Sequence, residues 1–102
     1  MYLIQILLPL YDNEQHPFAR TAFDEVRREL TEQFGGVTAY SRSPARGVWK
    51  EEGGEVSSDE VVIYEVMADE LERAWWQEYK QELARRFRQK EMLIRASRVD
   101  QL

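Results

Sequence analysis

The chain contains no cysteine among its 102 residues, and this absence excludes several kinds of structure and chemistry. Without thiols it forms no disulfide, binds no metal through a thiolate and uses no cysteine nucleophile. A chain of about this length buries enough apolar surface to be stable without covalent cross-links. The lack of cysteine is compatible with a reducing compartment, and we expect a cytoplasmic location.

Long apolar runs and an excess of positive charge are also missing. No stretch reaches the roughly 18 apolar residues that a membrane span requires. The start, MYLIQILLPLY, has neither a basic leader nor a small-residue cleavage site, so we interpret it as a strand and not as a signal peptide. The net charge is -5, whereas nucleic-acid-binding surfaces are normally basic. We therefore expect neither a membrane nor a nucleic acid as partner.

Sequence motifs of catalysis and metal binding are scarce. The chain has no G-x-S-x-G, no phosphate-binding loop, no H-E-x-x-H and no EF-hand pattern. Its one histidine, His16, follows Asp12 and Glu14 as D-x-E-x-H. One histidine with two loop carboxylates is a weak metal signal, and polar turns of this kind commonly precede helices. We expect no metal and no cofactor, and the sequence identifies no set of catalytic residues.

The chain does contain alternating strand-like and helix-like segments, which predict a single domain over residues 1–102. Strands are expected at residues 2–10, 37–50, 61–67 and 92–99, and Pro44 should interrupt the second of them. Apolar residues spaced by three and four predict helices over residues 17–34 and from Asp69 onward, where Asp69 and Glu72 fit a capping box. The order β-α-β-β-α-β is typical of a ferredoxin-like α+β fold. We expect an antiparallel four-stranded sheet in the order 4-1-3-2, with both helices on one face.

Three of the expected strands each carry one polar residue among apolar neighbours: Gln5, Glu65 and Arg95. Strand side chains alternate between faces, so these three residues share the face turned away from the helices. In the expected strand order they lie side by side, and Tyr40 and Arg42 could extend the row. The row is either the polar floor of a ligand cavity or a structural ion pair with a bridging amide. We prefer the structural interpretation, because buried charges need partners in any case.

The rest of that second face is apolar, and an exposed apolar patch of this size usually marks an interface. We therefore expect a homo-oligomer, most simply a two-fold dimer with sheets face to face. Trp49, with Tyr40, Arg42 and Arg46 on the same long strand, could bind a carboxylate-bearing ring, although such residues are also typical of interfaces, which we prefer here.

The aromatic and basic residues of the second predicted helix have structural interpretations that we prefer to ligand binding. Trp75 and Trp76 could stack on a flat ligand, but tryptophan on an amphipathic helix more often packs in the core. The basic residues Arg85, Arg86 and Arg88 crowd the last turn, where cations complement the helix dipole. We interpret them as a solvated helix end.

The segments LPLYDNE, FGGVTAYSRSPARGVWK and EVVIYEVM resemble small uncharacterised bacterial proteins of the dimeric α+β-barrel superfamily. The long interrupted strand and its hairpin are also similar to the trimeric CutA-like proteins. The first resemblance implies a ferredoxin-like homodimer, and the second keeps a trimer open. The superfamily includes cofactor-free monooxygenases, haem-degrading enzymes and lactone isomerases, but no catalytic set of theirs maps onto this chain.

Three functions fit the sequence. The first is a homo-oligomeric small-molecule-binding or accessory protein whose ligand contacts come from six residues: Gln5, Tyr40, Arg42, Trp49, Glu65 and Arg95. The second is a cofactor-independent monooxygenase or isomerase, with Glu65 or His16 as base and Arg95 or Arg42 stabilising an enolate. The third is a purely structural dimerisation domain. The first is the leading hypothesis.

Overall fold

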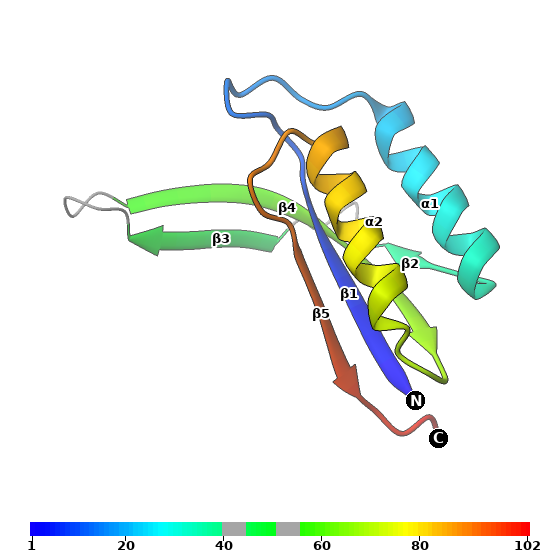
Figure 1. Ribbon diagram of the computed structural model, residues 1–102. Coiled ribbons are helices and arrows are strands. Elements are labelled where there is room, and N and C mark those ends of the chain that lie inside the picture. Colours follow the sequence, from blue (N-terminus) through cyan, green and yellow to red (C-terminus); the bar gives the residue numbers. More distant parts are fainter. Residues whose placement is uncertain (40–44, 51–55) are drawn as a thin grey trace.

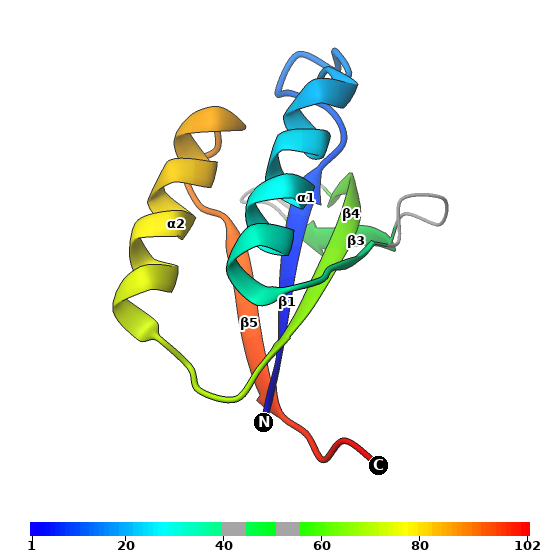
Figure 2. The same cartoon turned by 90° about the vertical axis from the view of Figure 1, so that its right-hand side faces the viewer.

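The protein folds into an antiparallel sheet with two helices on one side. The computed structural model describes the backbone of residues 1–39, 45–50 and 56–102, and the side chains of residues 1–39 and 61–102. Figure 1 shows the two layers and places the two chain ends at the same end of the sheet. Figure 2 looks onto the helices, with α2 on the side of β5.

The strands are β1 (Tyr2–Pro9), β2 (Thr38–Ala39), β3 (Ala45–Lys50), β4 (Val56–Ala68) and β5 (Leu93–Arg98). Their order across the sheet is β2-β4-β1-β5, and β3 also pairs with β4. Because β2 and β3 are the two parts of the expected second strand, this is the predicted order 4-1-3-2. The ferredoxin-like fold class is therefore confirmed.

The first helix, α1 (Arg20–Phe34), begins three residues later than the sequence predicts. Pro17 precedes it, and no side chain caps its start at Ala19. The helix ends where predicted, at Gly35, whose φ of 83° is a left-handed conformation that glycine adopts without steric cost. The Gly35 amide donates to the carbonyl oxygen of Thr31 at 2.8 Å, which closes the last turn.

The second helix, α2 (Arg73–Arg86), begins four residues after the predicted cap at Asp69. The capping-box prediction is wrong: Glu72 occupies the N-cap position and makes no side-chain capping bond. Residues 69–72 instead connect the end of β4 to the helix, with Leu71 packed against the core. Packing of Leu71 and the residues that follow sets the start of the helix here, and it outweighs the local capping preference.

The strand β4 is longer than expected and forms an arm with β3. It begins at Val56, five residues before the strand expected at residues 61–67, and its first residues pair only with β3. The pairing of β1 with β4 ends at Pro9 opposite Val61. The β3–β4 arm therefore extends beyond the helical layer, as Figure 1 shows.

The core lies between the sheet and the helices. The alternate residues of β1 and β4 that face the helices are almost fully buried: Ile4, Ile6, Leu8, Val62, Tyr64 and Val66. The helices contribute Val26, Leu30, Trp76, Tyr79 and Leu83, and Phe87 and Met92 follow α2. This helix-facing layer is the one that strand alternation predicts.

Candidate functional site

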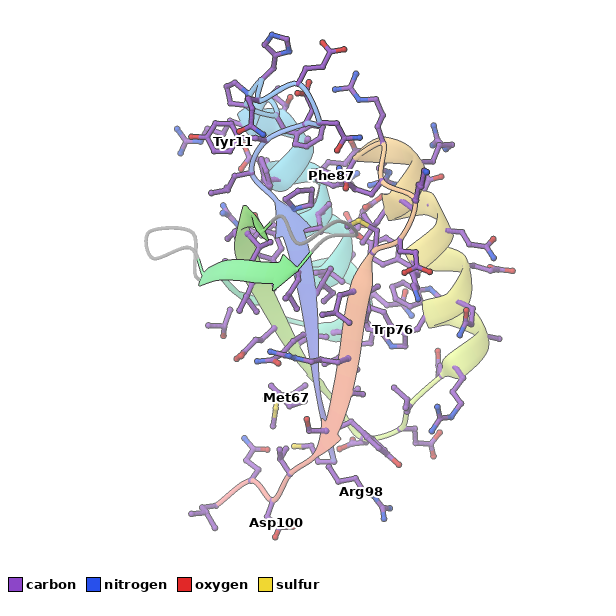
Figure 3. All side chains as sticks on the ribbon, turned by 90° about the vertical axis from the view of Figure 1, so that its left-hand side faces the viewer. Tyr11, Met67, Trp76, Phe87, Arg98 and Asp100 are labelled. Atoms are coloured by element: carbon purple, nitrogen blue, oxygen red, sulfur yellow. The ribbon has the colours of Figure 1, made fainter. Side chains whose placement is uncertain are left out.

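The register of the sheet brings three predicted residues into one row. Gln5 on β1 lies opposite Glu65 on β4 and opposite Arg95 on β5. All three have the strand parity that points away from the helices. Figure 3 views this open face of the sheet, with both helices behind it and Met67 labelled on the near side.

The amide of Gln5 joins the two charged residues of the row. Its Nε2 donates to Oε1 of Glu65 at 2.7 Å, and its Oε1 accepts from Nε of Arg95 at 2.7 Å. Hydrogen bonds to charged groups of this length are stronger than neutral ones. The row therefore carries a negative end on β4, a neutral bridge on β1 and a positive end on β5.

Apolar side chains surround this row on the face of the sheet that points away from α1 and α2. Leu3, Leu7 and Ile63 are half-buried. Met67 is 38% exposed and Leu93 is 52% exposed, so both present apolar surface to solvent. The open face thus combines an apolar surface with an ordered polar row, as the alternation of the strands predicts.

Three of the predicted ligand residues, Tyr40, Arg42 and Trp49, lie outside the residues whose side chains the structure describes. The backbone of Trp49 pairs with Ser57 in the β3–β4 arm. The proposed extension of the row by Tyr40 and Arg42, and the role of Trp49 with Arg46, stay predictions.

The loop that carries His16 is an ordered turn. Oδ1 of Asp12 accepts from the backbone amides of Glu14 and His16 at 2.8 and 2.9 Å. This bonding holds the pKa of Asp12 below its usual value, chiefly through the His16 amide. Among the described residues no cluster of histidine and carboxylate side chains could hold a metal ion.

The two tryptophans of α2 pack against aromatic neighbours. The Trp76 ring stacks on Phe34 of α1 with centroids 5.2 Å apart, and Trp75 stacks on Tyr79 at 4.8 Å. Trp75 also meets the edge of Phe34. The preference for packing over ligand stacking is confirmed at the Phe34 contact, which joins the two helices.

An ion pair between the helices was not predicted. Arg86 donates from Nη1 and Nη2 to the two carboxylate oxygens of Glu29 at 2.6 and 2.7 Å, and Tyr79 donates its hydroxyl to the same carboxylate at 3.0 Å. The Arg86 hydrogen bonds hold the pKa of Glu29 below its usual value, while burial is the main cause that raises the pKa of Tyr79. The interpretation of Arg86 as part of a solvated helix end is wrong, because Arg86 joins α2 to α1.

A cavity of about 290 Å³ lies between α2 and β5. Its apolar wall includes Ile4, Trp76 and Ile94, and its polar residues include Arg73, Gln77 and Lys80 of α2. Sequence reasoning missed this cavity, because it depends on how far α2 stands from the outermost strand. The spacing of Arg73, Gln77 and Lys80, which places them on one helix face, was the available signal.

Comparisons with known proteins identify the fold and no family. No family model and no curated protein matches the sequence. A phage SAM lyase, solved in complex with S-methyl-5'-thioadenosine, is similar in structure with a TM-score of 0.60 and 15% identity, over 94% of this chain and 79% of that chain. The same kind of lyase in its apo state matches with a TM-score of 0.61 and 13% identity, over 94% of this chain and 78% of that one.

A variant of CutA1 from Pyrococcus horikoshii OT3 is also similar, with a TM-score of 0.59 and 15% identity, over 100% of this chain and 86% of that chain. None of the helices in the described part of the chain has the length and apolar character of a membrane span. At these identities the likeness extends to the fold alone, which the chain shares with two kinds of small α+β protein.

Proposed function

We propose that this protein is a homo-oligomer that binds a small organic molecule, and that its subunits associate through the open face of the sheet. The observation that carries the proposal is the ordered row of Gln5, Glu65 and Arg95 within an apolar face. An apolar face of this kind is usually covered by another surface. A second copy of the chain is the occupant that the row itself favours.

The charges of the row are complementary to those of a second copy. Glu65 and Arg95 lie on opposite sides of Gln5. A two-fold axis parallel to the strands, passing beside Gln5, would set the Arg95 of each copy opposite the Glu65 of the other. A symmetric interface of this type is self-complementary, as closed dimers require. A cavity left over the row would present an amide, a carboxylate and a guanidinium to a ligand.

Self-association is tested by adding a charge to the open face. Leu93→Glu should convert the oligomer to a monomer, because a carboxylate at this position would be buried against the apolar surface of the other copy. Leu93 is already 52% exposed in the single chain, so the variant should still fold. Gln81→Glu adds the same charge on the exposed surface of α2 and should leave the assembly intact.

The measurement is the molar mass from sedimentation equilibrium over a range of protein concentrations. A wild-type protein that stays monomeric would contradict the proposal. An oligomer that survives Leu93→Glu would show that association uses another surface. A trimeric mass, sensitive to Leu93→Glu, would keep the open face and exclude the two-fold arrangement.

Ligand binding at the row is tested by a thermal-shift screen of small polar organic molecules against the wild-type protein. A compound bound at the row should lose its stabilising effect in Arg95→Met and keep it in Gln81→Glu. The ligand part of the proposal fails if no compound stabilises the protein and an experimental structure of the assembly shows a dry, closed interface. The row would then serve only to fix the register of the two sheets.

A further inference from the structure

The cavity between α2 and β5 has an unusual charge environment for an acidic protein. The chain has a net charge of -5, yet no aspartate or glutamate is among the described residues that line the cavity. Four cationic residues line it: Arg73, Lys80, Arg95 and Arg98. Arg95 points to the open face and bonds Gln5, so three cations remain for the cavity.

The other described cations are mostly neutralised by carboxylates. Five arginines form ion pairs: Arg27, Arg28, Arg85, Arg86 and Arg88. Within the described side chains, the lysines and arginines without a carboxylate partner are Arg20, Arg73, Lys80, Lys90, Arg95 and Arg98. Apart from Arg95, which bonds Gln5 on the open face, three of these six line the cavity: Arg73, Lys80 and Arg98. Positive charge that is left unneutralised around a concave surface favours the binding of an anion.

The elements around the cavity direct these cations toward it. Arg73 and Lys80 lie seven residues apart on α2, which places them on one face of the helix, with Gln77 between them. Arg98 has the same strand parity as Ile94, on the helix side of β5. Its guanidinium lies 5.6 Å from the ring centroid of Tyr2. Figure 3 places Arg98 at the end of β5, near the C-terminal segment.

The wall opposite the cations is apolar. Ile4 is fully buried and Trp76 is 7% exposed, and Ile94 is half-buried beside them. Figure 3 shows Trp76 between β5 and α2. Ligand sites typically combine an apolar wall with a few polar groups that fix the orientation of the ligand. The volume of this cavity is close to the lower limit of the usual range for such sites, which is roughly 300 Å³. The volume and the wall favour a ligand with a small apolar body.

We propose that the cavity between α2 and β5 binds a small organic carboxylate, with its apolar part against Trp76 and Ile94 and its charge among Arg73, Lys80 and Arg98. The carboxylate would accept hydrogen bonds from the lysine ammonium and the two guanidinium groups. This site lies on the helix side of the sheet. Of the row on the open face, only Arg95 also lines the cavity, and its side chain bonds Gln5 on the other side of the sheet. The site does not depend on self-association through the open face.

The probes are benzoate, phenylacetate and hexanoate, with benzamide as the uncharged counterpart of benzoate. They are titrated into the uniformly ¹⁵N-labelled full chain and followed by amide chemical shifts and by the Trp76 indole signal. The expected result is a set of shifts that converge on residues 71–80 and 94–98. Benzamide should bind at least about tenfold more weakly than benzoate, because it lacks the charge that the cations recognise.

Lys80→Met and Arg73→Met each remove one cation and keep much of the aliphatic side chain. Each should weaken carboxylate binding several-fold, and the double variant about tenfold or more. Lys90→Met is the matched control, because Lys90 also lacks a carboxylate partner among the described residues but lies outside the cavity. Thermal unfolding of each variant verifies that it folds.

The proposal is overturned if none of the three carboxylates produces shifts at the cavity, or if benzamide binds as well as benzoate. It is also overturned if Lys90→Met weakens binding as much as Lys80→Met, which would indicate a general charge effect. Shifts confined to β1 and β4 around Gln5 would instead support the ligand site of the proposed function. Each of the two proposals can therefore be refuted without refuting the other.

Discussion

At the scale of single residues, two hydrogen bonds constrain which side chain can occupy the position of Gln5. Its amide donates to a carboxylate and accepts from a guanidinium in the same row. Leucine supplies neither group, and an ionised glutamate only accepts, so neither could replace both bonds. A residue that bridges here must both donate and accept, which the amide of Gln5 does.

The energy of this bridge can be measured with a double-mutant cycle. Gln5→Leu should lower the free energy of unfolding by about 1 kcal/mol, because Glu65 loses a donor and Arg95 an acceptor. Glu65→Leu should cost at least as much. The double variant should cost less than the sum of the two, because paired removal leaves fewer groups without partners. Urea unfolding at one fixed protein concentration gives the three values, and strict additivity would contradict the coupling.

The row could be predicted from the sequence because each of its members follows or interrupts a run of apolar residues in an expected strand. The hydrophobic pattern then fixes the register, since a slip of one residue would turn every apolar side chain to the wrong face. The partnership of Arg86 with Glu29 could not be predicted in this way. The two residues are 57 positions apart, and they meet only because of the angle and height at which α1 and α2 pack.

At the scale of elements, side-chain contacts join the two helices to each other as well as to the sheet. The stacked rings of Phe34 and Trp76 connect them at one end, and the Glu29–Arg86 pair connects them further along. The start of α2 shows the limit of local sequence signals at this scale. The capping box at Asp69 is present in the sequence, but packing of Leu71 and the following turn places the helix start at Arg73 instead.

The Glu29–Arg86 pair predicts a dependence of stability on pH. The pKa of Glu29 is lower in the folded protein than its value of 4.5 in the unfolded chain. The pair therefore stabilises the fold fully above that value, and the stabilisation is lost as the pH falls through the lowered pKa of the folded state. Both side chains are less than a quarter exposed, so the loss should be about 1–2 kcal/mol.

The measurement compares wild type with Glu29→Gln by urea unfolding. The variant should be less stable by about this amount near pH 7, and the difference should shrink at acidic pH, as the pH falls through the lowered pKa of Glu29. Glu25→Gln, an exposed position on the same helix, controls for the loss of one negative charge. A difference between wild type and Glu29→Gln that is equal at both pH values would contradict the proposed ion-pair contribution.

At the scale of the whole molecule, one face of the sheet is covered by helices and the other carries ordered polar groups among apolar side chains. If the second face is covered by another copy, folding and association are coupled.

The thermal midpoint of the wild-type protein should then rise with protein concentration, by a few degrees for each tenfold increase. Leu93→Glu should remove this dependence and bring the midpoint close to the value of the wild type at its lowest concentration, while Gln81→Glu should retain it. A wild-type midpoint that does not change with concentration would mean that the open face stays uncovered, because mass action requires any association that stabilises the folded chain to appear in this measurement.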